Sequence, residues 1–556
     1  MTRTGPGTAS VPSRIRAGPR EAPGIALNAR RATRMLVWIT ALGTFYLLLN
    51  LLHFPFGRDQ GIFAMVADTF FEGGVPYRDA WDFKTPGIFF VFAAARGLLG
   101  QGELALRLFE GLVWLAMGSG IVLLSRQFVD WRAGAIGFAM AVLGLMTNGF
   151  WHVGQPESLA AALVVWAIAL THLNGSRRWA AWFAVAVLYS LAGFLKPTLV
   201  AGVFVSFAWV MARTVRAEGP AAWWRPTLAF AAGGAVSVLA LWSWLQVSGA
   251  WPAFHDALFV YAPRYTALGH SDLSMPVLFG TGLFKYLAVW PILSMGSLLL
   301  LLERRDRLLM SATAHVLGVM LAILFGVALQ AKFFYYHYGT VVALGGLLAG
   351  WGYWGLWQRL RLHRFALAAI LALWAALALL PSEGRQFWKN NIHRLNALVQ
   401  PSARNAIFDK LYRVHGFDID AIRRTSAWLA GAAPPDDPTL FIWGFEPSIY
   451  LYSGLTPHNR FIYNAPMRAP WLRDDAMAEF RAAYDARKPW SIVVQSNDRL
   501  PRVTGDPRSS AEVLPEDFPM LRDIIARDYT LRQSFGPMAI YTLNEALPVQ
   551  SASTGF

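Results

Sequence analysis

The chain has 556 residues, of which 55% are hydrophobic and only 15% are charged, and its mean hydropathy is positive at +0.38. This composition excludes a disordered chain and argues against an ordinary soluble globule. The absence of cysteine excludes disulfides, thiol chemistry and cysteine metal sites, and the net charge of +15 reflects arginine-rich loops, because no nucleic-acid motif interrupts the apolar runs.

The first 34 residues are polar and rich in arginine, without a small-residue cleavage site near an early apolar core. They predict a cytoplasmic tail and an uncleaved first helix. Further apolar runs, each near the 20 residues that span a bilayer, predict a transmembrane domain over 35–381 with about eleven helices. The predicted spans are 35–53, 104–124, 134–150, 157–173, 179–195, 198–212, 227–247, 283–302, 309–329, 338–356 and 364–381.

Gly87 to Gly100 is apolar but short, and it predicts an interfacial or re-entrant helix within an external loop over 54–103. The distribution of arginine supports this choice, because a spanning helix here would put the arginine clusters outside. With the tail inside, the arginines gather in the loops predicted to be cytoplasmic: Arg126, Arg132, Arg177, Arg178, Arg213, Arg216, Arg225, Arg304, Arg305, Arg307, Arg359, Arg361 and Arg364.

The composition changes beyond Pro381. Residues 382–435 predict an external helical connector, and 436–550 predict an extracytoplasmic α/β domain of three or four strands. Three strand-like runs carry the second prediction, TLFIWGF, WSIVVQS and MAIYTLN. The predicted fold class is therefore a polytopic α-helical membrane protein with a small C-terminal α/β domain.

The loop after the first span contains a carboxylate and a lysine that predict chemistry. A carboxylate such as Asp59, near the membrane surface, can act as a general base when partial burial raises its pKa; a solvated loop aspartate is the plain alternative. In Asp82–Gly87, Pro86 and Gly87 open the short helix. Its free N–H groups and Lys84 could hold a phosphate together, although an ordinary interfacial helix start with a snorkelling lysine is equally open.

Later external segments contain further candidates. Glu157 in GQPES could be a second carboxylate facing Asp59, sharing catalysis or holding a cation, or simply an acid that favours a helix start. Lys196 and Lys332 follow helix ends on the same predicted side, and ammonium groups suit phosphate. Tyr336 and His337 lie near Lys332. An aromatic belt is the plain explanation for the tyrosine, and a hydrogen-bonded interfacial histidine is the plain explanation for His337.

The first loop resembles that of bacterial GT-C glycosyltransferases, specifically the family-39-like (RgtA/B/C/D-like) group related to ArnT and the protein mannosyltransferases. The resemblance rests on an acid and glycine after the first span, on Gly74–Asp79 (G-x-P-Y-x-D) and on Asp82–Gly87 (D-x-K-x-P-G). GQPES, LKPT, KFFYYHYGT and Phe441–Asn464 resemble later segments of the group. Two departures are Thr85 for the first proline of Pro-Pro-Gly and Gln60 for a second acid.

The resemblance implies transfer of a sugar from a polyprenyl-phosphate donor to a glycolipid, polysaccharide or protein acceptor outside the bacterial cytoplasmic membrane. It implies Asp59 as base and Glu157 in the acceptor or donor-sugar site. Donor-phosphate contacts would be Lys84, Arg58, Lys196 and Lys332, and substrate contacts Asp82, Tyr336 and His337. No metal site is assigned, although a divalent cation is possible, and no nucleic-acid partner is expected.

Two other classes of function remain open. A transporter or flippase for a lipid-linked sugar would also need cations for phosphate, but such proteins usually place charges near the bilayer midplane and often have repeated halves. A non-catalytic envelope assembly protein would not depend on Asp59 or Lys84. An enzyme predicts that Asp59, Lys84 and Glu157 meet at one outward-facing cavity.

Overall fold

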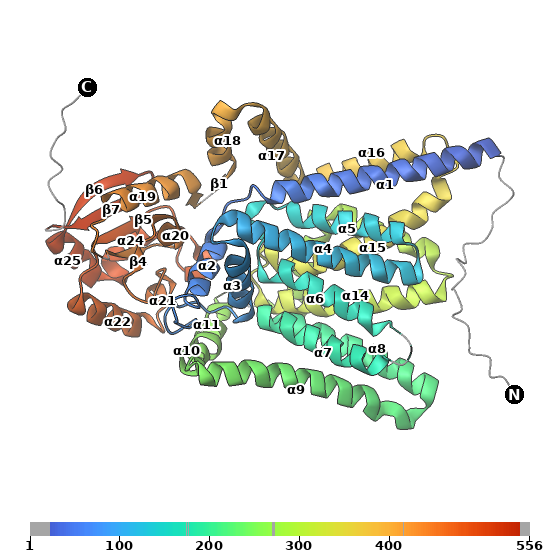
Figure 1. Ribbon diagram of the computed structural model, residues 1–556, viewed down its shortest axis with the longest axis horizontal. Helices are drawn as coiled ribbons and strands as arrows, with labels where there is room; N and C mark the ends of the chain where they lie inside the picture. Colours follow the sequence, from blue (N-terminus) through green and yellow to red (C-terminus); the bar gives the residue numbers. More distant parts are fainter. Residues whose placement is uncertain are drawn as a thin grey trace.

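The structure, a computed structural model, describes residues 23–544 except 174, 176, 269–272, 415 and 437. It consists of a long bundle of helices with a smaller α/β unit at one end (Figure 1). The bundle helices are α1 (Pro23–Leu51), α4 (Glu103–Phe128), α5 (Trp131–Met146), α6 (Pro156–Thr171), α7 (Arg178–Leu195), α8 (Ala201–Glu218), α9 (Trp224–Val247), α12 (Met275–Val289), α13 (Pro291–Leu298), α14 (Arg307–Gln330), α15 (Gly339–Leu360) and α16 (Ala366–Leu379).

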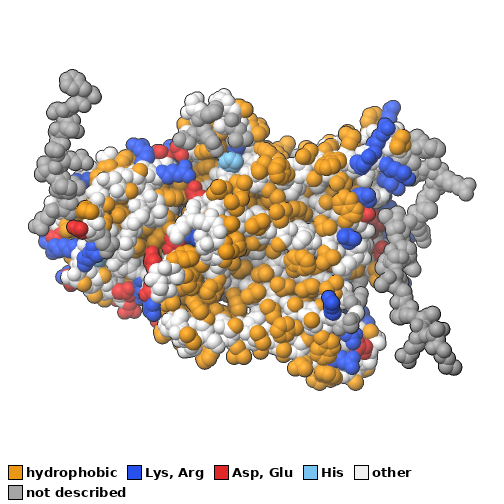
Figure 2. All heavy atoms as spheres, viewed as in Figure 1, with side chains coloured by type: hydrophobic (Ala, Val, Ile, Leu, Met, Phe, Trp, Pro, Cys, Tyr) orange, Lys and Arg blue, Asp and Glu red, His pale blue; other side chains and the backbone are white. Residues whose placement is uncertain are grey.

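Six described helices are long and apolar enough to cross a membrane, and the number rises to eight if each of two sharply bent pairs is one span. The predicted spans 134–150 and 157–173 fall on α5 and α6, which have only 16 residues each. Figure 2 shows apolar side chains covering the visible side of the bundle, with charged groups at its ends. The chain is therefore a multi-pass membrane protein.

The predicted span at 283–302 is not one straight helix, because α12 and α13 meet at an angle of 97°. Trp290 leaves the helical region, with φ −124° and ψ 58°, directly before Pro291. Proline disfavours helical conformation in the residue before it and lacks the N–H that would continue the helix, so the chain bends here.

Glycines let the central helices of the bundle approach each other closely. A Cβ on Gly350 would lie 2.4 Å from the backbone of Gly137, and one on Gly346 would lie 2.6 Å from the Ala141 nitrogen. Apolar burial does not drive helices together in lipid, so close packing of small residues is the main contact between α5 and α15.

Short segments fill the junction between the bundle and the α/β unit. There lie α2 (Arg58–Asp68) and α3 (Gly87–Leu99), the short helix expected from the sequence, together with α10 (Trp251–His255), the π-helical η4 (Asp256–Tyr261) and α11 (Ala262–Ala267) (Figure 1). The short 3-10 turns are η1 (Phe150–His152), η2 (Pro197–Val200), η3 (Pro220–Trp223), η5 (Leu299–Glu303), η6 (Tyr335–Tyr338) and η7 (Pro401–Ala403).

After α16 the chain bends by 103° into α17 (Ser382–Val399) and continues through α18 (Arg404–Leu411), the hairpin β1 (Arg413–Val414) and β2 (Phe417–Asp418), and α19 (Ile419–Ala432). A five-stranded sheet of order β4-β3-β5-β7-β6 follows. Its strands are β3 (Thr439–Trp443), β4 (Thr456–Pro457), β5 (Ser491–Gln495), β6 (Tyr529–Phe535) and β7 (Met538–Leu543). The helices around it are α20 (Ser448–Ser453), α21 (Ala465–Arg468), α22 (Arg473–Ala486), α23 (Pro501–Thr504), α24 (Ser510–Asp517) and α25 (Pro519–Asp528).

The three strand-like runs are β3, β5 and β7, so the predicted fold class is confirmed, while β4 and β6 were not expected. The edge strand β6 was missed because its five central residues are all exposed and polar or mixed, without the alternation of a half-buried strand. The start of α1 and the α/β unit lie at opposite ends of the bundle (Figure 1). Residues 1–22 of the predicted tail and 545–550 of the predicted C-terminal domain lie outside the described residues.

Candidate active site

Helix α2 positions Asp59 between the bundle and the α/β unit. It begins at Arg58, so that Asp59 stands in its first turn, where a carboxylate is stabilised by the helix dipole. A Cβ on Gly61 would lie 3.2 Å from the backbone nitrogen of Ser448, so this face of α2 rests directly on α20. The Asp59 carboxylate accepts a hydrogen bond of 3.2 Å from the Gln155 side chain.

The segment Asp82–Gly87 positions Lys84 by docking onto the end of α7. The Thr85 hydroxyl donates to the Leu195 carbonyl at 2.9 Å. Gly87 approaches so closely that a Cβ there would lie 2.5 Å from the carbonyl of Phe194, so glycine is required at this position. The Tyr77 hydroxyl donates to the Lys84 carbonyl at 2.8 Å. The lysine backbone is therefore fixed from two sides.

Asp59 and Lys84 line one cavity of about 110 Å³. Asp82 also lines it, and so do three tyrosines, Tyr265, Tyr336 and Tyr463. The cavity lies at the end of the bundle that carries the α/β unit, since Tyr463 belongs to that unit and Asp59 to the junction. The arrangement brings two carboxylates, the Lys84 ammonium, the Arg58 guanidinium and three phenol groups around a small space.

The ammonium of Lys84 can pair with an anion that enters this cavity. It forms no hydrogen bond or ion pair with any residue that the structure describes, and its ammonium lies 4.4 Å from the centre of the Phe83 ring. Burial by itself would lower the pKa of Lys84, but the charges of Asp59 and Asp82 outweigh it and raise the pKa. The lysine is therefore cationic at neutral pH.

Asp82 is almost completely buried. One of its oxygens accepts a 2.8 Å hydrogen bond from the Tyr463 hydroxyl, and the other has no hydrogen-bond donor among the described residues. Burial raises the pKa of Asp82, partly offset by Lys84 and the Tyr463 hydrogen bond. An unpartnered buried acceptor at a cavity wall is a group that a substrate hydroxyl can satisfy.

Glu157 does not line the cavity, and it does not face Asp59 across it as expected. The carboxylate is buried and pairs with the Lys196 ammonium at 3.1 Å, with only 2% of the glutamate side chain and 14% of the lysine side chain exposed. His337 lies near this pair, since burial and then the charge of Lys196 lower its pKa. Glu157, Lys196 and His337 form a layer behind the cavity wall.

Arg58 and Lys332 are engaged with the α/β unit, so their cations are less available to phosphate than expected. The Arg58 guanidinium pairs with Glu446 at 2.5 Å and donates to the Phe445 and Gly416 carbonyls. The Lys332 ammonium donates to the Arg502 carbonyl at 2.6 Å and lies 3.9 Å from the centre of the Tyr265 ring. Burial, with help from nearby Lys84 and Arg502, lowers the pKa of Lys332 to about 8.

The two carboxylates of the cavity, from Asp59 and Asp82, are of the kind that bind metal ions. No group of three or more His, Asp or Glu side chains among the described residues is placed to hold a metal ion. Asp59 and Asp82 share the cavity with Lys84, and an ammonium beside two carboxylates competes with a cation.

Sequence patterns did not indicate the contributions of Gln155, Tyr265 and Tyr463. Gln155 belongs to the GQPES segment, but its neighbour Glu157 was the more obvious chemical group. The two tyrosines are 198 residues apart in the chain, one in α11 and one after β4. Their contact with the cavity, which they share with Tyr336, is visible only in the folded structure.

Comparisons with solved structures identify the fold of the chain. No model of a protein family matches the chain, and no curated protein matches it in sequence. Among solved structures, the chain is similar to ArnT from Cupriavidus metallidurans bound to undecaprenyl phosphate, with 15% identity, a TM-score of 0.57, and coverage of 92% of this chain and 98% of that one. Its apo structure gives the same TM-score and coverage at 14% identity. The polypeptide is thus a multi-pass membrane protein with the GT-C fold.

Proposed function

We propose that the protein transfers a sugar from a polyprenyl-phosphate donor to an acceptor at the outer face of a bacterial cytoplasmic membrane. The observation that carries the proposal is the placement of Asp59 and an uncommitted Lys84 on one cavity. The similar structure of ArnT was solved with undecaprenyl phosphate bound, and this supports a lipid phosphate as the partner.

The proposed reaction needs a base and a site for the departing phosphate. Asp59 takes the proton from an acceptor hydroxyl, whose oxygen then bonds to the anomeric carbon while the bond from that carbon to the phosphate oxygen breaks. The leaving polyprenyl phosphate gains negative charge, which the Lys84 ammonium stabilises as it develops. Attack opposite the leaving group inverts the anomeric centre.

Other groups of the site have supporting roles in this proposal. The Gln155 amide orients the Asp59 carboxylate, and the free oxygen of Asp82 accepts from a sugar hydroxyl. Lys196 and Lys332 add positive potential near the phosphate, with Glu157 holding Lys196 in place. Arg58 joins α2 to the α/β unit through Glu446, so its contribution is to fix the position of Asp59.

The location of the charges supports an enzyme over a transporter. Asp59, Asp82 and Lys84 line a cavity that α2 forms with the α/β unit, and that unit lies at one end of the bundle (Figure 1). A transporter instead needs a binding site near the midplane. The arginine-rich loops at the other end support an outward-facing cavity through the positive-inside rule.

The test is transfer by the purified full chain with a panel of synthetic polyprenyl-phosphate sugars. Asp59→Asn removes the base and should lower the rate by about 10²–10⁴-fold, and Lys84→Ala should lower it comparably. Glu72→Gln and Lys389→Ala are matched controls, because both side chains are exposed and outside the cavity. Equal transfer by all five proteins, or none with any donor, would contradict the proposal.

A further inference from the structure

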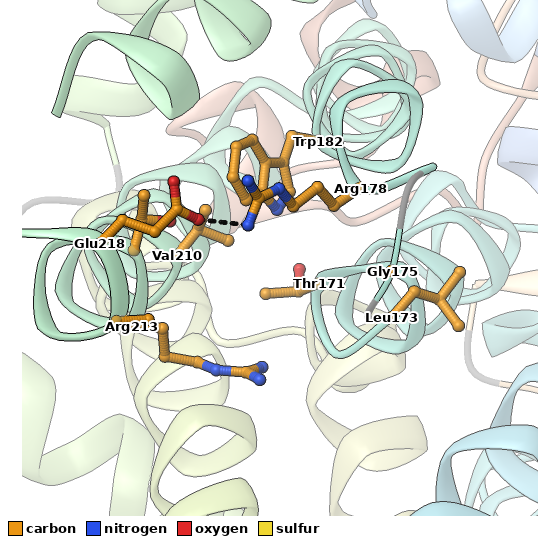
Figure 3. A pocket seen from close by; sticks show the side chains of 10 residues that line it. Thr171, Leu173, Gly175, Arg178, Trp182, Val210, Arg213 and Glu218 are labelled. Atoms are coloured by element: carbon orange, nitrogen blue, oxygen red, sulfur yellow. Dashed lines mark hydrogen bonds and ion pairs between the residues drawn. The ribbon is translucent and has the colours of Figure 1, made fainter. Parts of the chain in front are cut away.

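A second cavity lies at the opposite end of the bundle from the proposed active site. It has a volume of about 140 Å³ and is formed where α6 ends, α7 begins and α8 ends. Figure 3 shows Arg178 and Arg213, from different helices, on either side of Thr171. The predicted topology places this end in the cytoplasmic leaflet, since it belongs to the arginine-rich loops.

The cavity is surrounded by more positive than negative charge. Glu218 pairs through one oxygen with Arg178, a lining residue, and through the other with Arg225, from the start of α9. Arg213 is the second guanidinium group of the lining, beside Arg178. Glu218 is the only carboxylate among the residues described as lining the cavity, so an anion would be attracted there. The planar forks of Arg178 and Arg213 match the oxygens of a phosphate.

Tryptophans place the cavity at the level of the membrane interface. Trp182 forms part of its wall, and the Arg178 guanidinium lies 5.7 Å from the centre of that ring. Trp179 packs between Trp182 and Trp224, at 6.0 and 5.7 Å between ring centres. Trp224 is 47% exposed. Tryptophans at helix ends characteristically lie at the depth of lipid head groups, so a ligand can enter from the lipid phase.

A buried chain of hydrogen bonds holds the cavity walls together. The His172 and His315 rings join α6 to α14 at 3.0 Å, and His315 joins the Ser206 hydroxyl of α8, also at 3.0 Å. Ser206 in turn meets the Tyr189 hydroxyl of α7 at 2.9 Å. The three helices that form the cavity are therefore fixed relative to one another before any ligand arrives, which lowers the entropic cost of binding.

We propose that this cavity binds the phosphate of an anionic phospholipid from the cytoplasmic leaflet. Basic pockets between transmembrane helices on the cytoplasmic side are suited to such head groups. The tryptophan cluster favours a lipid over a soluble phosphate, because it places the cavity at the depth of lipid head groups. The acyl chains of a lipid bound there would lie along the apolar sides of α7 and α8. The site is independent of the sugar-transfer proposal, since its residues lie at the other end of the bundle.

The experiment measures lipid binding to the purified full chain in detergent by native mass spectrometry and thermal shift. The probes are dioleoyl phosphatidylglycerol, dioleoyl phosphatidylcholine and inorganic phosphate. The double variant Arg178→Gln with Arg213→Gln should bind phosphatidylglycerol at least about tenfold more weakly, as each arginine near an anionic lipid contributes about 1 kcal/mol. If the double variant does not fold, Arg213→Gln alone replaces it in the binding measurement. This single variant keeps both ion pairs of Glu218, with Arg178 and with Arg225.

The matched control is Arg126→Gln with Arg304→Gln, which removes two exposed arginines from the same end of the bundle outside the cavity. It should change phosphatidylglycerol affinity less than about twofold. Equal affinity for phosphatidylcholine, or equal loss in the control, would overturn the proposal, because either result means unspecific attraction. Stabilisation by inorganic phosphate as large as that by phosphatidylglycerol would overturn the assignment to a lipid.

Discussion

Replacement of Lys84 by Met removes one charge from the proposed active site while keeping a flexible apolar stem of similar length. Lys84 forms no ion pair or hydrogen bond with the residues that the structure describes, so the substitution leaves no native partner exposed. What it does leave is a cavity with two carboxylates, Asp59 and Asp82, and no ammonium.

The size of the effect follows from the charge that is lost. An ammonium and a phosphate about 4 Å apart attract each other by about 4 kcal/mol at an effective dielectric constant of 20. A loss of about 4 kcal/mol in the transition state corresponds to about a 10³-fold lower kcat/KM. The two carboxylates repel the leaving phosphate equally in both proteins, so the lost attraction to Lys84 sets this figure for Lys84→Met.

The assay is kcat/KM for sugar transfer from a synthetic polyprenyl-phosphate donor, with gel filtration and thermal unfolding to verify the fold. Lys84→Arg keeps the charge and should recover a substantial part of the loss, whereas Lys389→Met on the exposed face of α17 should have no effect. A Lys84→Met protein that folds and keeps more than about a tenth of wild-type kcat/KM would refute the electrostatic role.

Three further predictions concern the supports of the site. Glu157→Gln and Lys196→Met should each destabilise the fold by about 3–5 kcal/mol, since each leaves a buried charge unpaired, while the double variant Glu157→Leu with Lys196→Met should recover most of the melting temperature; additive losses would argue against the pair. Gly87→Ala should cost about 1–3 kcal/mol through its clash with the Phe194 carbonyl, whereas Gly111→Ala in α4, with no atom within 4 Å of its Cβ, should be neutral or slightly stabilising. Because burial and neighbouring cations lower the pKa of Lys332 to about 8, its ammonium is charged below that pH and neutral above it. Affinity for polyprenyl phosphate should therefore fall between pH 7 and pH 9, and a fall of the same size in Lys332→Met would exclude this lysine as the cause.

Local patterns predicted the elements whose signal lies within one segment. The apolar runs predicted most bundle helices, and Pro86 with Gly87 predicted the start of α3 at the residue where it begins. The exposed edge strand β6 and the bend at Trp290 were missed because neither leaves the apolar run or alternation that the predictions used. The bend depends on how one proline interrupts a run that is otherwise continuously apolar.

The shared side of the polar groups was also predictable, whereas their partners were not. Arginine asymmetry along the chain indicated that Asp59, Lys84, Glu157 and Lys196 lie at one end of the bundle. It could not indicate that Glu157 pairs with Lys196 behind the cavity wall, because that pair depends on how α6 and α7 pack.

The amino-acid sequence by itself determined that this is a helical membrane protein with a small C-terminal α/β unit and with an acid and a lysine in the segment after its first long helix. Hydrophobic length and charge asymmetry are local properties of the chain, so they need no tertiary contact to be recognised. Only the tertiary structure decided which charges are committed: Arg58 to Glu446, Lys196 to Glu157 and Lys332 to the Arg502 carbonyl. Those pairings join segments distant in sequence through packing, and they leave Lys84 as the ammonium available in the cavity among the residues described.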